Sequence, residues 1–307
     1  MTNRFLLLSI LTTLSLTLGC GNGAGGPGGS SDEPPIKIGY MICNSLEESK
    51  ERFEPITAYL TEKIGRPFES TFVNTFAFED LVRQKKVDFT HSNSILYIIF
   101  AKDYGATLVA TDVRGRHGPN DTGAIVALKK SGIETLEDIR GKSMVFGPAL
   151  APFGYMAQYY LMLKNGIDPE EDLPFYAIPW GAYKHEKLIY GVMFGAYDVG
   201  AAPRLDLDLM AHEGKINLKD FNIIGESIPM PYCTISALPH VDGDLIQEVR
   251  QVLVSMKVDE TVLVNGEVVN IAKRSYNDGG FVKIPDSEYD PIRERLKACN
   301  MAPYKTY

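Results

Sequence analysis

The most distinctive chemistry in this chain belongs to its cysteines and histidines. Three thiols follow Cys20, and they are Cys43, Cys233 and Cys299. Three thiols form at most one internal disulfide bond, and their spacing matches no zinc-site pattern. Isolated cysteines most often pack as small buried hydrophobic residues. A thiolate that met His91 or His185 would instead bind a soft metal or metalloid solute, or would act as a nucleophile.

The chain carries none of the sequence motifs that would support catalysis. There is no nucleophile elbow, P-loop or zinc-protease pattern. We therefore predict a protein that is not an enzyme and that uses no cofactor and no metal.

A second set of candidate groups is polar and lies at the ends of predicted strands. Asn44 follows the strand Ile36–Ile42, and His91-Ser92-Asn93-Ser94 follows the strand Val87–Phe89. Loops after the strands of α/β sheets lead into helix N-termini, where free N–H groups bind anions. Ser94 is also the expected N-cap of a helix over Ile95–Ala101.

The elements that must position these groups alternate between strand and helix. The stretch Ser45–Ile64 carries apolar residues at helical spacing, and Pro55 is expected to kink or delimit that helix. Such alternation favours an α/β fold with parallel sheets covered on both faces. The further predicted strands are Phe68–Val73, Thr107–Ala110, Ala124–Leu128, Ser143–Phe146, Phe175–Ile178, Val199–Ala201, Ile223–Ser227 and Thr234–Leu238.

The N-terminus reads as an export signal followed by a tether. Arg4 precedes an uncharged, leucine-rich stretch, 5–19, that is too short to span a membrane. The sequence Leu16-Thr17-Leu18-Gly19-Cys20 resembles the lipobox of bacterial lipoproteins, although Thr17 stands where leucine is preferred. This implies that residues 1–19 are a signal peptide and that Cys20 is lipidated. Residues 20–35 are rich in glycine and are expected to form a flexible tether.

Composition excludes two classes of partner for the remaining body. Lys and Arg total 31 against 39 Asp and Glu, which gives a net charge of −8. The chain lacks the positive field that nucleic acid or an anionic bilayer would attract. We therefore expect no nucleic-acid partner, and contact with the membrane only through the lipid anchor.

Several short motifs occur in an order that resembles the periplasmic binding proteins of phosphate, phosphite and phosphonate ABC importers. The motifs are Phe53-Glu54-Pro55, Lys86-Val87-Asp88-Phe89, Ser131-Gly132-Ile133 with Leu136 to Lys142, Gly195-Ala196-Tyr197-Asp198-Val199-Gly200-Ala201, Ile228-Pro229-Met230-Pro231 and Tyr289-Asp290-Pro291-Ile292-Arg293. The resemblance implies a two-lobed type II periplasmic binding protein fold. Each lobe would be a sheet flanked by helices, and two crossing strands would join the lobes.

The resemblance also implies domain boundaries. Residues 36–123 and 235–307 would form lobe one, and residues 124–234 would form lobe two. The crossings would lie near Thr122–Val126 and Tyr232–Ser236. The Pro229-Met230-Pro231 sequence fits a chain that leaves one domain for another.

One loop departs from the family pattern. Members typically carry an Asp-Pro-x-Ser-Thr-Ser-Gly loop whose hydroxyls and N–H groups hold a phosphoryl oxyanion. Here the stretch reads Pro148-Ala149-Leu150-Ala151-Pro152-Phe153-Gly154, so the glycine stays and every hydroxyl is lost. Each lost charge-assisted bond is worth roughly 1.5–3 kcal/mol. Tight phosphonate binding is therefore not expected.

Candidate ligand residues follow from the strand ends and from the resemblance. His185 with Glu186 aligns with a His–acid pair that faces the ligand in relatives, and Arg204 follows a strand and could bind an anion. Phe153, Tyr155 and Trp180 could instead line an apolar pocket, or pack in the core. The complete predicted ligand set is Tyr40, Asn44, His91, Ser92, Asn93, Ser94, Thr122, Tyr155, His185 and Arg204.

The predicted function is capture of a small solute outside the cytoplasm for an ABC importer. The solute would be anionic or zwitterionic and would resemble a phosphonate or another oxyanion. Three alternatives remain open at this point. The membrane partner could be a sensor kinase or chemoreceptor, the solute could be a soft metal bound by cysteine and histidine, or the cleft could hold a catalyst.

Overall fold

The computed structural model describes residues 34–114, 118–179 and 184–306. These residues belong to one structural unit. The predicted signal peptide, Cys20, nearly all of the tether and Trp180 lie outside the described residues. Within them, no helix is both long and apolar enough to cross a membrane.

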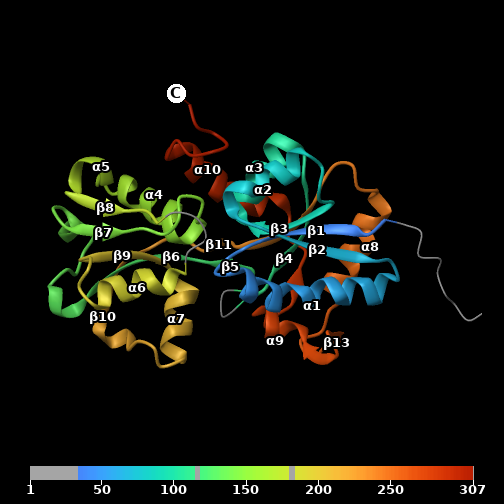
Figure 1. The fold of residues 1–307 in the computed structure, drawn as a ribbon. Coiled ribbons are helices and arrows are strands. Elements are labelled where there is room, and N and C mark those ends of the chain that lie inside the picture. The colour runs from blue at the N-terminus through green and yellow to red at the C-terminus, as the bar shows by residue number, and fades with distance from the viewer. Residues whose placement is uncertain (1–33, 115–117, 180–183, 307) are drawn as a thin grey trace, which may run out of the picture. The chain divides into compact units, whose positions relative to one another are not determined.

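The first lobe is built on a six-stranded sheet (Figure 1). In sheet order its strands are β15 (Phe281–Val282), β4 (Thr107–Asp112), β12 (Cys233–Ala237), β3 (Phe89–Asn93), β1 (Ile36–Met41) and β2 (Phe68–Val73). Strands β1, β2 and β3 are parallel, whereas β12 is antiparallel to both β3 and β4. The expectation of purely parallel sheets is therefore wrong, because β12 brings the chain back from the second lobe and enters the sheet in the opposite direction.

Helices cover both faces of this sheet. One core packs α1 and α8 against the strands, and the other packs α2, α3 and α10. The two groups lie on opposite sides of the sheet (Figure 1). The bounds are α1 (Leu46–Ile64), α2 (Thr75–Arg83), α3 (Ser94–Tyr104), α8 (Gly243–Val254), α9 (Ile271–Ser275) and α10 (Asp290–Ala298).

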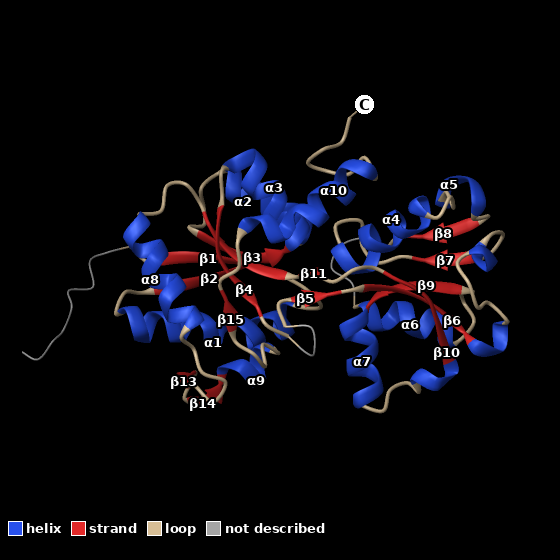
Figure 2. Cartoon of the chain, turned by 180° about the vertical axis from the view of Figure 1, so that it is seen from behind, coloured by secondary structure: helices blue, strands red, loops and turns tan. Residues whose placement is uncertain are grey.

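The second lobe is built on a five-stranded sheet (Figure 2). In sheet order its strands are β10 (Phe221–Glu226), β6 (Gly123–Leu128), β9 (Val199–Pro203), β7 (Ser143–Val145) and β8 (Phe175–Ala177). Its helices are α4 (Ala157–Lys164), α5 (Pro169–Asp172), α6 (His185–Met193) and α7 (Arg204–His212). α4 packs in one core of this lobe, while α6 and α7 pack in the other. The predicted α/β fold class is confirmed.

The helix termini show one cap that was not predicted, that of Ser45, and they bear on the two expectations for Pro55 and Ser94. Ser45 caps α1, because its Oγ accepts the N–H of Glu48 at 3.1 Å. Pro55 does not end this helix, which continues to Ile64. Ser94 is not the N-cap of α3, because β3 extends to Asn93 and the side-chain oxygen of Asn93 accepts the N–H of Leu96 at 3.0 Å.

The chain passes between the lobes through a short antiparallel pair. β5 (Asn120–Asp121) precedes β6, and β11 (Met230–Pro231) follows β10. We call this pair the hinge. A hairpin in the first lobe, β13 (Thr261–Val264) and β14 (Glu267–Asn270), was not expected from the sequence.

A buried carboxyl group lies within the hinge. Oδ1 of Asp121 accepts the N–H groups of Thr122 at 2.8 Å and Leu205 at 3.2 Å, and Oδ2 has no partner among the described residues. Burial raises the pKa of Asp121 to about 7, and the nearby carboxylates of Asp206 and Asp208 raise it further against those two hydrogen bonds. The uncharged form of Asp121 is thus favoured by folding.

This carboxyl group makes stability depend on pH in a defined direction. Because its pKa is higher in the folded than in the unfolded chain, its stabilising contribution is complete below about pH 4 and falls as pH rises towards 7. We expect Asp121→Asn to match the wild type near pH 4.5 and to exceed its free energy of unfolding by about 2–4 kcal/mol at pH 8. Urea unfolding at pH 4.5, 6 and 8 measures this. The exposed carboxylate of Asp259 gives the control, Asp259→Asn, and equal pH dependence in all three proteins would contradict the assignment.

Candidate functional site

A pocket of about 1380 Å³ lies between the lobes. Its first-lobe wall comes from the ends of β1 and β3, from the start of β12, from the start of α1 and from β14 and α9. Its second-lobe wall comes from the loop 148–153 and from the first turns of α6 and α7. The pocket is therefore built where strands end and helices begin, as in other α/β proteins.

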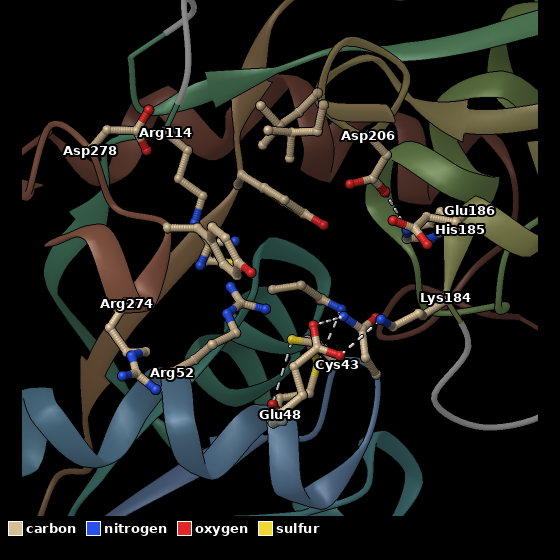
Figure 3. A pocket seen from close by; sticks show the side chains of 18 of the residues that line it. Cys43, Glu48, Arg52, Arg114, Lys184, His185, Glu186, Asp206, Arg274 and Asp278 are labelled. Carbon is tan, nitrogen blue, oxygen red and sulfur yellow. Dashed lines mark hydrogen bonds and ion pairs between the residues drawn. The ribbon is translucent and has the colours of Figure 1, made fainter. Parts of the chain in front are cut away.

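Arg52 is a buried cation of this pocket, whereas Lys273 and Arg274, which also line it, are exposed. Arg52 is only 7% exposed, and its guanidinium lies 4.8 Å from the Phe53 ring centre and 5.1 Å from that of Tyr276. Nη2 donates to the carbonyl of Ser275 at 3.4 Å, and Nε has no partner. No carboxylate of the described residues forms an ion pair with it. Figure 3 shows the guanidinium pointing into the pocket.

A second guanidinium, that of Arg114, lies near that of Arg52 (Figure 3). Its Nη2 donates to Asp112 at 2.7 Å, and its Nε donates to the side-chain oxygen of Asn277 at 2.9 Å. The Tyr232 ring centre lies 5.8 Å away. These contacts fix the position of Arg114, and its charge is balanced by that of Asp112.

Asp112 connects this arginine to the interior of the first lobe. Its carboxylate is fully buried and also lies 2.9 Å from Nε2 of His91. Burial acts to raise the pKa of Asp112, but the attraction of His91 and Arg114 outweighs it and holds the pKa well below its ordinary value. The carboxylate is therefore charged at neutral pH, and His91 lies beneath the pocket rather than along it.

Charges on the second-lobe side of the pocket are paired. Lys184 reaches across to Glu48 of α1 at 3.0 Å. Nδ1 of His185 lies 2.9 Å from Asp206, and Lys215 lies 2.7 Å from Glu186. None of these groups offers an unbalanced charge to a ligand.

The loop 148–153 gives this side of the pocket an apolar surface. Pro148, Leu150, Ala151, Pro152 and Phe153 line it, and none of their side chains carries a hydrogen-bond donor. The Leu150 carbonyl accepts from the Asn93 amide of the first lobe at 2.9 Å. This bond and the Lys184–Glu48 pair hold the two walls together.

Two of the three later cysteines line the pocket, and all three are free thiols. Burial raises the pKa of Cys233 to about 12 even though Arg114 acts to lower it, so Cys233 is protonated at neutral pH. The described part of the chain contains no cluster of three or more histidine, cysteine or acidic side chains able to hold a metal ion. The histidines predicted to join Cys43 or Cys233 pair with aspartates instead. The metal hypothesis therefore gains no support from these residues.

The structure places the predicted ligand residues in two groups. Asn44, Asn93 and His185 line the pocket. The remaining predicted residues do not appear in its lining, and they are Tyr40, His91, Ser92, Ser94, Thr122, Tyr155 and Arg204.

Most residues of the second group make contacts elsewhere. The hydroxyl of Tyr40 bonds that of Thr57 at 2.8 Å, and Tyr155 packs against Phe146 in the second lobe. Arg204 pairs with Asp208 at 3.1 Å and with Glu226 at 3.2 Å, and Thr122 bonds the same Glu226.

Sequence reasoning missed Arg52 and Arg114. The signal for Arg52 was weak, because only its spacing of four residues from Glu48, on the same face of α1, connects it with another pocket residue. Arg114 was missed because the strand predicted as Thr107–Ala110 ended too early, so that Arg114 did not come directly after it. The strand extends to Asp112, and Arg114 comes two residues later.

A protein-family model matches most of this chain. The model of the phosphonate periplasmic substrate-binding protein of ABC transporters matches residues 38–289. This chain belongs to that family. Members bind a small solute outside the cytoplasm and work with an ABC permease, so the predicted resemblance is confirmed.

Solved structures show the same fold. PhnD1 from Prochlorococcus marinus, in complex with methylphosphonate, has a TM-score of 0.72 and 14% identity, over 86% of this chain and 98% of its own. A binding protein component of an ABC phosphonate transporter from Pseudomonas aeruginosa has a TM-score of 0.71 and 18% identity, over 88% and 87%. These matches support the two-lobed type II fold.

A curated relative comes from a different kind of system. The tetrathionate sensor histidine kinase TtrS of Salmonella typhimurium (strain LT2) is 24% identical over 231 residues. The match covers 70% of this chain and 38% of the kinase, so the chain corresponds to well under half of that relative.

The cluster that Asp112 forms with His91 and Arg114 can be tested by removing the charge of Asp112. Asp112→Asn leaves Arg114 buried without a counter-ion, and we expect a loss of about 3 kcal/mol in the free energy of unfolding. Asp80→Asn removes an exposed partner of Arg83 and should cost under about 1 kcal/mol. Urea unfolding at pH 7 compares the two, and an Asp112→Asn protein as stable as the Asp80→Asn protein would refute the role of the cluster.

Proposed function

We propose that this chain is a lipid-anchored, extracytoplasmic solute-binding protein that captures a small anion in the pocket between its lobes and presents it to an ABC permease. The observation that carries the proposal is Arg52, a buried cation that points into the pocket without a carboxylate partner. A buried, uncompensated charge is costly. An anionic solute would supply the missing counter-charge.

The surroundings of Arg52 support an anion site. Arg114 is held beside it by Asp112 and Asn277, and Asn44 lies on the same wall. A guanidinium presents several N–H donors in one plane, which suits the oxygens of a carboxylate, sulfonate or phosphonate. Fixed donors lose little entropy when a ligand binds.

Lobe closure is the proposed mechanism of capture. The pocket takes one wall from each lobe, and the hinge is only two residues long on each strand. The Lys184–Glu48 ion pair and the Asn93–Leu150 hydrogen bond join the walls. Opening would break both contacts and expose Arg52, and a bound anion would favour the closed state.

Thermal unfolding with added anions tests the site. A ligand that binds only the folded state raises the melting temperature. We expect at least one carboxylate, sulfonate, phosphonate or inorganic oxyanion to raise it in the wild type, and Arg52→Gln to weaken that binding by tenfold or more. The matched control is Arg83→Gln, because Arg83 is an exposed arginine away from the pocket. If no anion raises the melting temperature, or if Arg52→Gln binds as the wild type does, the proposal fails.

The lipid anchor is proposed from the sequence, since Cys20 lies outside the described residues. Cells that express the wild type should hold the protein in the membrane fraction, with a mass increased by the lipid. Cys20→Ser should release it as unmodified protein. An unchanged mass and location for the Cys20→Ser protein would remove this part of the proposal.

Ligand delivery to a sensor is the second candidate function. It is favoured by the match between this chain and part of a tetrathionate sensor kinase. Uptake of a labelled ligand, once one is identified by the thermal assay, separates the two functions. Loss of uptake on deletion of the gene supports transport, whereas intact uptake with a lost transcriptional response supports sensing.

A further inference from the structure

We infer that the solute is an organic monoanion, a sulfonate or a carboxylate with an apolar body. Its charged head would bind at Arg52 and Arg114, and its body would lie against the loop 148–153. This inference rests on the proposed anion site and adds the class of ligand. It follows from three features of the pocket, which are its charge balance, its apolar wall and the lack of strong hydrogen-bond donors on its floor.

The charge balance of the inner pocket favours a single negative charge. Arg114 is neutralised by Asp112, and Lys184 by Glu48. His185 is paired with Asp206. Arg52 is the buried lining cation without an ion-paired carboxylate among the described residues, whereas Lys273 and Arg274 also line the pocket but are exposed. One anionic charge compensates Arg52, whereas a second charge on the ligand would be desolvated without a partner.

The apolar wall favours a ligand with a hydrocarbon part. The residues Pro148, Leu150, Ala151 and Pro152 contribute apolar atoms, and Pro148 and Pro152 also lack a backbone N–H. Across from this wall, the Asn93 amide already donates to the Leu150 carbonyl, and the Asn44 amide donates to the Glu48 carboxylate. A compact ion with oxygens on every side would place some of them against the side chains of Pro148, Leu150, Ala151 and Pro152, which donate no hydrogen bonds, and this is costly.

The floor of the pocket, between the two arginines and the loop 148–153, offers few groups that could bind an oxyanion. Met41, Cys43 and Cys233 line it, and their sulfur atoms are weak hydrogen-bond partners. Burial raises the pKa of Cys233 to about 12, so it presents a neutral thiol. The largely buried charged donors of the first-lobe wall are thus those of Arg52 and Arg114, which suits a compact head on an apolar body.

Calorimetric titration of the full chain with two homologous series tests the inference. One series runs from methanesulfonate to hexanesulfonate and the other from acetate to hexanoate, with inorganic phosphate and methylphosphonate alongside at pH 8. Where the body reaches the loop, each added methylene should lower Kd about fourfold. The longer members of at least one series should bind at least tenfold more tightly than phosphate or methylphosphonate. The series that binds distinguishes sulfonate from carboxylate.

Two variants locate the ligand's ends. Leu150→Asn should remove most of the gain in affinity with chain length, and Pro148→Ser is a second variant of the same wall with the same expected effect. Arg52→Gln should weaken binding of every member. If phosphate or methylphosphonate binds more tightly than the longer anions, or if chain length has no effect, the inference is overturned while the anion site stands. If no anion binds at all, both fall.

Discussion

The carboxylate of Asp112 is the group on which the geometry of the first lobe's pocket wall depends. It lies at the end of β4, fully buried, and joins His91 of β3 to Arg114 of the pocket. A buried carboxylate is tolerated only where donors surround it, and here an imidazole and a guanidinium do so. The same contacts hold Arg114 in place beside Arg52. The pocket wall is thus organised by a charge that does not itself line the pocket.

The central strands around Asp112 carry other buried polar groups, and these are matched in the same way. The hydroxyl of Thr90 bonds that of Ser236 at 2.7 Å across β3 and β12. The hydroxyl of Thr111 bonds that of Tyr289 at 2.9 Å. Because such groups are stable inside a protein only when paired, they fix the register of β3, β12 and β4 more strictly than apolar residues would. A strict register places the strand ends, and so the pocket residues, at defined heights.

These buried polar pairs also explain which parts of the molecule the sequence could predict. Strands β1, β2 and β6 begin and end with apolar or small residues and were predicted nearly to the residue. β3 was predicted to end at Phe89, whereas it extends through four polar residues whose partners lie far away in the sequence. The shortened strand suggested that His91 and Ser92 lay in a loop. Their burial could not be predicted without knowing that Asp112 and Thr234 lie next to them.

The hairpin β13–β14 was missed for a different reason. Asn265 and Gly266 have φ values of 51° and 86°, as expected for a two-residue turn between antiparallel strands. The local signal was therefore present in the sequence. Arg52 had no comparable signal, because an arginine within an amphipathic helix usually extends into solvent and only the contact with Ser275, more than 200 residues later, buries it.

Gly154 shows how a family feature can persist while the chemistry beside it changes. A Cβ on this residue would lie 2.6 Å from Nε2 of His185, so any larger residue would force the His185 ring to move from its place beside the loop. The Gly147 N–H also donates to the Gly154 carbonyl at 2.6 Å, which closes the loop on itself. Neither contact involves an anion. The glycine therefore preserves the shape of the loop, whereas the neighbouring Ala151, Pro152 and Phe153 determine what that shape can bind.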